Sequence, residues 1–185
     1  AVLAEHLLNP SEDVLKGYQS AQRAFDTAGA PELGLMAATF ALGLENYLGP
    51  TNLEDVVKRA DALLAAPELL PLDRGRLLRT KAAILAYHGQ DYRYALTLLE
   101  EAQGYFSPEA TPLEWIKTRC EQAYVKRYLE RLDEALSELD DLMPLFERVS
   151  LPLQKAFYTK LLSSVLLMLG SYDQGIAAIK LAEKD

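Results

Sequence analysis

The chain has little of what most small catalytic or metal-binding sites are made of. Its 185 residues include one cysteine, Cys120, and two histidines, His6 and His88. A single cysteine excludes a disulfide framework within the chain and a zinc site built from several thiolates. Two histidines leave few side chains for metal binding or for acid–base chemistry near neutral pH. We therefore expect no metal site and no cofactor.

Long hydrophobic runs and an excess of positive charge are also missing. The longest apolar stretch, at residues 161–170, is interrupted by Ser163 and Ser164 and falls short of the roughly 18 residues that a membrane span needs. The start of the chain lacks the basic segment of a secretory signal. The net charge of −8 argues against a general nucleic-acid binder, because neutralising phosphates requires a basic surface. Together with the lone cysteine, these features predict a cytoplasmic protein without a nucleic-acid or membrane partner.

Catalytic motifs are absent from the sequence as well. It contains no glycine-rich phosphate loop, no nucleophile elbow and no HExxH zinc motif. Acidic residues cluster at 100–101 and 133–141, but without the twelve-residue spacing of a calcium loop. We interpret these clusters as solvated faces of helices, and we expect the chain not to be an enzyme.

A repeating helical pattern is what the sequence does contain. Five apolar or glycine residues spaced i, i+3, i+4, i+7 and i+10 recur five times, which places each set on one stripe of an α-helix. The second members of the five stripes are 39 or 40 residues apart, so the stripes belong to a repeat. These second members are Gly17, Val56, Ala95, Ala135 and Gly175.

Another helical segment precedes each stripe after the first. These segments run at about 35–48, 76–88, 113–129 and 153–169, and a short turn joins each one to its stripe. Asn52 and Asp91 are suited to cap the helices that follow these turns. Prolines mark the longer joints between helix pairs, where we expect them to end the preceding helix. No alternating strand pattern competes, so the sequence predicts an all-α protein.

The turn and helix at residues 89–96, followed by Leu99 and Ala102, resemble the turn and second helix of a tetratricopeptide repeat. Residues 132–136 and 170–176 are similar to the same element. The period of 39–40 residues exceeds the usual 34 and is similar to that of helical regions in large bacterial transcription activators and multi-domain signalling proteins. The resemblance implies one repeat domain over residues 1–185, a right-handed α-solenoid of antiparallel helix pairs. Its repeats are expected at about 1–30, 31–68, 69–108, 109–148 and 149–185.

The resemblance also implies a binding groove lined by the first helix of each pair. In tetratricopeptide proteins that groove holds an extended peptide or a helix of a partner. Basic side chains and tyrosines at the corresponding positions of this acidic chain suit an acidic peptide. In the alternative interpretation, the lysines solvate a helix surface and the tyrosines pack between repeats. The groove positions are Tyr87, His88, Lys117, Tyr124, Arg127, Tyr128, Phe157 and Lys160.

The leading hypothesis is therefore a non-enzymatic scaffold for protein–protein interaction. The alternative is a regulatory, sensory or oligomerisation segment of a multi-domain bacterial transcription activator or signalling protein. Both ends read as cut from a longer array, with residues 1–8 as the remainder of a first helix. Ile176 and Ile179 would then face nothing, so we expect self-association through the open ends or continuation into further repeats. Cys120 is expected to be a buried, inert thiol.

Overall fold

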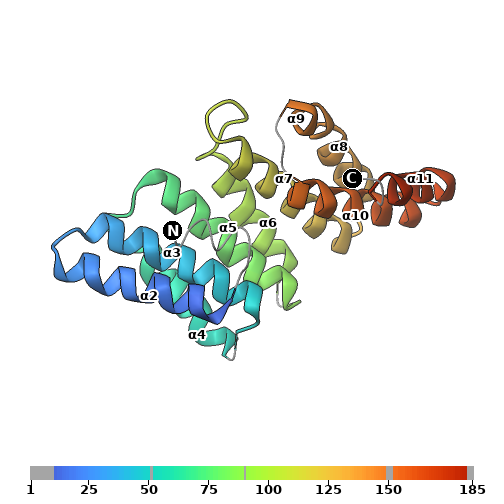
Figure 1. The fold of residues 1–185 in the computed structure, drawn as a ribbon. Helices are drawn as coiled ribbons and strands as arrows, with labels where there is room; N and C mark the ends of the chain where they lie inside the picture. Colours follow the sequence, from blue (N-terminus) through green and yellow to red (C-terminus); the bar gives the residue numbers. More distant parts are fainter. Residues whose placement is uncertain (1–10, 51, 90, 149–151, 183–185) are drawn as a thin grey trace. The chain divides into compact units, whose positions relative to one another are not determined.

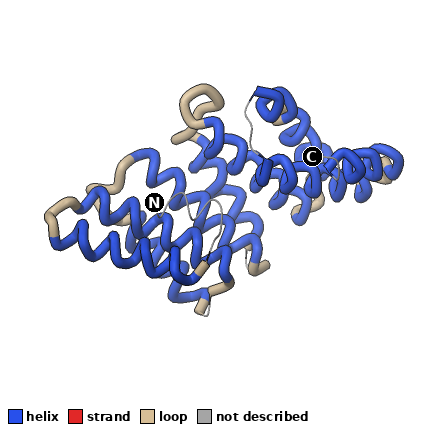
Figure 2. The backbone as a smooth tube through the Cα atoms, in the orientation of Figure 1, coloured by secondary structure: helices blue, strands red, loops and turns tan. Residues whose placement is uncertain are grey.

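The computed structural model describes residues 11–50, 52–89, 91–148 and 152–182. All regular secondary structure in these ranges is helical, which confirms the predicted all-α class (Figure 2). The expected helix remainder at residues 1–8 lies outside the described residues. In chain order the helices are α2 (Glu12–Thr27), α3 (Pro31–Leu48), α4 (Leu53–Leu64), α5 (Pro71–Tyr87), α6 (Tyr92–Gln103), α7 (Pro112–Tyr128), α8 (Leu132–Asp140), α9 (Met143–Arg148), α10 (Pro152–Met168) and α11 (Tyr172–Ala182) (Figure 1).

Contacts divide the chain into an N-terminal unit, Ala1–His88, and a C-terminal unit, Gly89–Asp185. In the N-terminal unit α3 packs against α2, α4 and α5, and α4 also packs against α5. In the C-terminal unit α7 packs against α6 and α8, while α10 packs against α7, α8 and α11. Within each unit, therefore, a helix packs on helices that are one to three elements away in the chain.

Side-chain caps begin several of these helices where the sequence predicts them. Asn52 accepts a hydrogen bond of 3.2 Å from the backbone N–H of Asp55, and Asp91 accepts one of 2.9 Å from that of Tyr94. Both caps satisfy a backbone donor that has no partner inside its own helix. The predicted starts of α4 and α6 are confirmed.

The prolines act differently from the expectation that they end the helices before them. Pro31, Pro71, Pro112 and Pro152 are each the first residue of a helix. At that position the missing N–H has no partner within the helix in any case, and the fixed φ of proline already suits the helix. The prolines thus begin the first helix of each pair. For this reason α3 and α5 start several residues earlier than the apolar pattern alone predicts, and α7 and α10 start one residue earlier.

Residues with positive φ follow five of the described helices. After α2, α3, α5 and α10 the residue is a glycine (Gly29, Gly49, Gly89 and Gly170), whereas after α7 it is Glu130, with φ of 60°. The Arg131 N–H donates to the Lys126 carbonyl at 2.9 Å, as in the usual glycine-ended helix. Glu130 therefore adopts a backbone conformation that favours glycine, although it carries a side chain.

We expect Glu130→Gly to raise the free energy of unfolding by about 1 kcal/mol, because glycine has no Cβ to clash in the left-handed region. Glu130 is exposed, so its side chain has little packing to lose. Chemical denaturation of the variant and of Glu130→Ala measures the effect. Equal stability of the two variants would show that the left-handed backbone carries no such cost.

The repeated stripes form the centre of the packing. Val56, Ala95 and Ala135 have no exposed surface, and Gly175 is buried. At Gly175 a Cβ atom would lie 3.0 Å from Cγ of Leu167, so the small residue lets α11 approach α10 closely. Cys120 is 2 % exposed, as predicted, and burial raises the pKa of its thiol above the usual range. Both observations agree with the packing role that the sequence assigned to these positions.

Candidate partner-binding site

Three tyrosines and an arginine gather on the surface of the C-terminal unit. The rings of Tyr92, from the start of α6, and Tyr128, from the end of α7, stack with centroids 4.8 Å apart and an angle of 4° between their planes. Tyr124, one turn earlier on α7, tilts against Tyr128 at 4.9 Å. We call the following set the tyrosine–arginine cluster: Tyr92, Tyr124, Arg127, Tyr128, Lys160 and Ser164.

Arg127 joins the two helices that carry most of the cluster. Its guanidinium carbon lies 4.4 Å from the ring centroid of Tyr128 and 5.4 Å from that of Tyr124, which is cation–π distance. Its Nη1 donates a hydrogen bond of 2.5 Å to Oγ of Ser164 on α10. The arginine is thus fixed in position by α7 and α10 together, with its charge beside the aromatic rings.

The surroundings of the Tyr128 hydroxyl favour its negatively charged form. This hydroxyl accepts a hydrogen bond from the Tyr124 hydroxyl and is also acted on by Arg127 and by the charge of Lys160, and these effects lower the pKa of Tyr128. Burial and the hydrogen bond that it donates to Tyr128 raise the pKa of Tyr124. Because Tyr128 is 46 % exposed, this point of positive potential faces solvent. The local electrostatics favour negative charge there.

The structure thus brings four of the predicted groove residues into one cluster: Tyr124, Arg127, Tyr128 and Lys160. Phe157, on α10, instead packs against the buried core of the C-terminal unit. Lys117 lies on α7, is half-buried and already has an interaction partner.

The other two predicted groove residues, Tyr87 and His88, lie at the end of α5 in the N-terminal unit. Both are exposed. They belong to a different unit from the tyrosine–arginine cluster.

Tyr92 is a member of the cluster that is not among the predicted groove residues. It is the first residue of the repeated stripe that contains Ala95. In the structure the stripe's second to fourth residues, from Ala95 to Leu99, are buried, whereas Tyr92 is only half-buried. The aromatic ring at the start of α6 can therefore reach the end of α7, which a one-helix pattern does not reveal.

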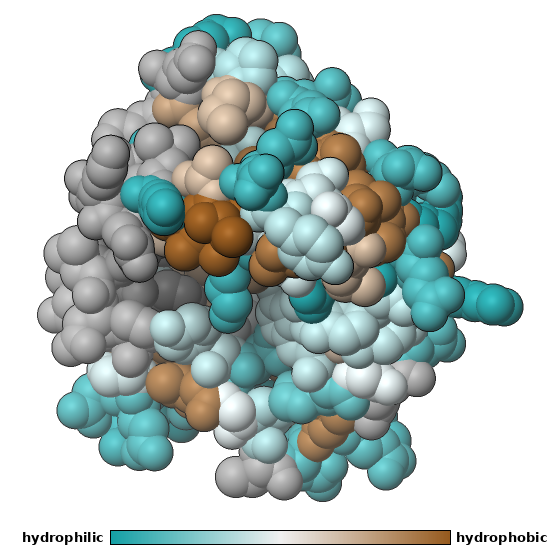
Figure 3. Space-filling model, turned by 90° about the vertical axis from the view of Figure 1, so that its right-hand side faces the viewer, coloured by the Kyte–Doolittle hydropathy of each residue, from teal (hydrophilic) through white to brown (hydrophobic). Residues whose placement is uncertain are grey.

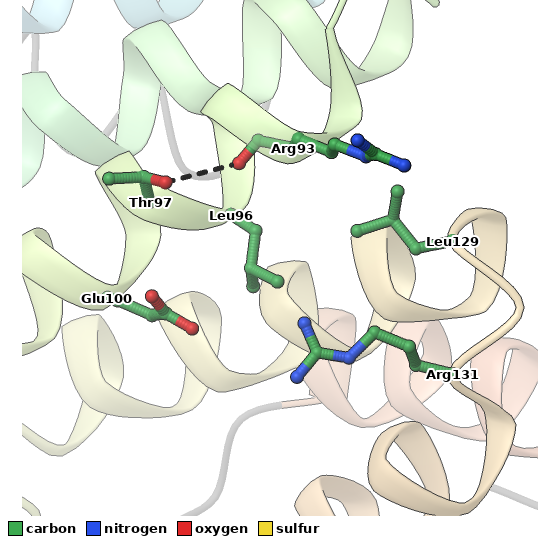
Figure 4. A pocket seen from close by; sticks show the side chains of 6 residues that line it. All are labelled: Arg93, Leu96, Thr97, Glu100, Leu129 and Arg131. Atoms are coloured by element: carbon green, nitrogen blue, oxygen red, sulfur yellow. Dashed lines mark hydrogen bonds between the residues drawn. The ribbon is translucent and has the colours of Figure 1, made fainter.

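A separate hollow of about 350 Å³ lies between α6 and the turn after α7 (Figure 4). Arg131, at one side, forms hydrogen bonds of 2.7 and 2.5 Å to the two carboxylate oxygens of Glu134, so its charge is already neutralised. Thr97 donates to the backbone oxygen of Arg93 and stays within its own helix (Figure 4). We find no arrangement of reacting groups in this hollow.

In the described part of the chain, no three histidine, cysteine or carboxylate side chains are placed to hold a metal ion. Among the same residues, no helix has the length and hydrophobicity needed to cross a membrane. Comparisons with protein-family models, with curated proteins and with solved structures gave no match. The interpretation of the candidate site therefore rests on its own chemistry.

Proposed function

We propose that this protein is a non-enzymatic interaction module, built as a right-handed solenoid of helix pairs like those of tetratricopeptide repeats. Two observations support the solenoid. The stripe recurs every 39 or 40 residues, and within each unit the helices pack on near neighbours in the chain. Such an array offers a continuous surface of successive helices to a partner.

We further propose that the tyrosine–arginine cluster binds an acidic peptide or helix of a partner protein. The observation that carries this proposal is the guanidinium of Arg127, which a hydrogen bond to Ser164 holds 4.4 Å from the ring centroid of the exposed Tyr128, in a chain whose net charge is −8. A carboxylate at this point gains charge-assisted hydrogen bonds, which are stronger than those between neutral groups. The stacked tyrosines add a rigid apolar surface of the kind that is common at binding hot spots.

The proposal is tested with pairs of short peptides that differ only in Glu or Gln at the same positions. We expect the protein to bind the Glu peptides at least tenfold more tightly, as measured by fluorescence anisotropy at low salt. The double variant Arg127→Glu, Lys160→Glu should abolish this preference, because it reverses both charges that face the carboxylate.

The matched control is the double variant Lys16→Glu, Lys58→Glu, which changes the net charge equally at two exposed helical sites of the N-terminal unit. We expect this control to keep most of the preference for Glu peptides. If both double variants lose it equally, the attraction comes from overall charge and the cluster is not the binding site. The same conclusion follows if the wild-type protein binds Glu and Gln peptides alike.

A further inference from the structure

The last described helix, α11, carries an apolar stripe that differs from its counterparts in one respect. At the fourth position of the repeated pattern, Ala60, Leu99 and Leu139 have no exposed surface, whereas Ile179 is 43 % exposed. At the third position Leu96 is 5 % exposed, while Ile176 is 46 % exposed. In the α11 stripe, therefore, Gly175 is buried against α10, whereas the large apolar residues Ile176 and Ile179 are exposed.

The helices that carry the other stripes have a shared neighbour relation. In each case the first helix of the next pair packs against the helix that carries the stripe: α3 against α2, α5 against α4, α7 against α6 and α10 against α8. At the last of these interfaces, Leu139 shares a buried cluster with three side chains of α10, namely Tyr158, Leu161 and Val165. By analogy, the element that fits the α11 stripe is a helix with large apolar residues at the positions of these three α10 side chains.

The exposed surface extends beyond α11 itself. Leu167 of α10 lies against Gly175, on the same side of the helix pair, and is 36 % exposed. Figure 3 looks onto the face that includes α11 and shows hydrophobic surface there between hydrophilic patches. We call Leu167, Ile176 and Ile179 the α11 surface. These three large, partly exposed apolar side chains form a surface of the kind that packs against another helix.

We propose that the α11 surface is a docking site for an amphipathic helix of the α10 type, with large apolar residues at i, i+3 and i+7. The occupant repeats the α8–α10 interface one step further along the array. Its stripe covers Ile176 and Ile179 as Tyr158, Leu161 and Val165 cover Leu139. This site is distinct from the tyrosine–arginine cluster and does not depend on the function proposed for that cluster.

The test uses a fluorescent peptide with the sequence of residues 152–169, added to the 185-residue protein. We expect saturable binding by anisotropy, and at least tenfold weaker binding to Ile179→Lys. A peptide carrying Val165→Asp, which interrupts the apolar stripe, should not bind. The matched control is Tyr47→Lys, which makes the same change of charge at a 72 % exposed aromatic residue of α3 and should leave binding unchanged.

Because Ile179 is exposed, Ile179→Lys should unfold at the same temperature as the wild-type protein, and circular dichroism checks this. If the variant is less stable, Ile176→Lys replaces it in the comparison. Absence of peptide binding, or equal binding to wild type and to the lysine variants, would overturn the proposal. Sedimentation of the protein alone tests whether a second copy occupies the surface instead. If the wild-type protein forms a dimer that Ile179→Lys dissociates, and if no peptide binds, the choice of occupant is wrong.

Discussion

Leu139→Ala is expected to lower the free energy of unfolding by about 3 kcal/mol. Leu139 has no exposed surface and lies in the core where α7, α8 and α10 meet, beside Ile116, Ala123 and Val165. Replacing a buried leucine by alanine loses the free energy of transferring the removed atoms out of water, and it leaves a cavity that the surrounding helices close only in part. Together these two effects cost roughly 2–5 kcal/mol, and we expect about 3 kcal/mol at Leu139. Urea denaturation, with the slope compared between proteins, measures the difference.

The control for this experiment is Leu167→Ala, which makes the same chemical change at a 36 % exposed site. We expect that variant to lose well under half as much, because part of the side chain is already in water. A loss at Leu139 no larger than at Leu167 would contradict the core described for the C-terminal unit.

Glu138→Ala is expected to lower the free energy of unfolding by about 2 kcal/mol, for a different reason. The Glu138 side chain is 12 % exposed, and its Oε1 accepts a hydrogen bond of 2.6 Å from Nζ of Lys126. Its other carboxylate oxygen forms an ion pair with the guanidinium of Arg119. Both cations lie on α7, while the carboxylate lies on α8. Deleting the carboxylate leaves Arg119 paired with the exposed Asp141 at 2.8 Å and Lys126 with Glu134 at 3.8 Å. The expected loss is therefore below the roughly 3–5 kcal/mol of a buried charge that is left without any partner, and within the ~1.5–3 kcal/mol of a hydrogen bond to a charged group.

The matched comparison replaces all three charges, as Arg119→Met, Glu138→Leu, Lys126→Met. We expect this triple variant to be more stable than Glu138→Ala, because no uncompensated charge remains in the interface between α7 and α8. Thermal unfolding of both variants, followed by circular dichroism, provides the measurement. If the triple variant is the less stable of the two, the ion pairs stabilise the fold by more than their desolvation costs.

The sequence predicted the helices well because each one carries its own signals. The repeated stripes identified the helices, and the caps at Asn52 and Asp91 set two starts correctly. The prolines were harder to interpret, since a proline that ends one helix and a proline that begins the next look alike in a sequence. The short helix α9 was missed because its six residues carry too little pattern.

The candidate site was predicted only in part. The resemblance to tetratricopeptide repeats brought Tyr124, Arg127, Tyr128 and Lys160 into consideration, because they stand at positions that line the groove in that family. It also included Phe157, which packs on the core, and it omitted Tyr92. A pattern along a single helix specifies the face of a residue but not which neighbouring helix end comes within reach.

By itself, the sequence determined that the protein is helical and that its helices carry a stripe recurring every 39 or 40 residues. It also determined that the chain has one cysteine and two histidines, which are few residues for metal or thiol chemistry. These properties follow from local spacing and composition, which are present before any folding. Only the tertiary structure decided that Arg127 is held between tyrosines and Ser164, that Glu138 lies between two cations, and that Ile179 stays exposed. Each of these features depends on contacts between separate helices, and these contacts form only when the helices pack together.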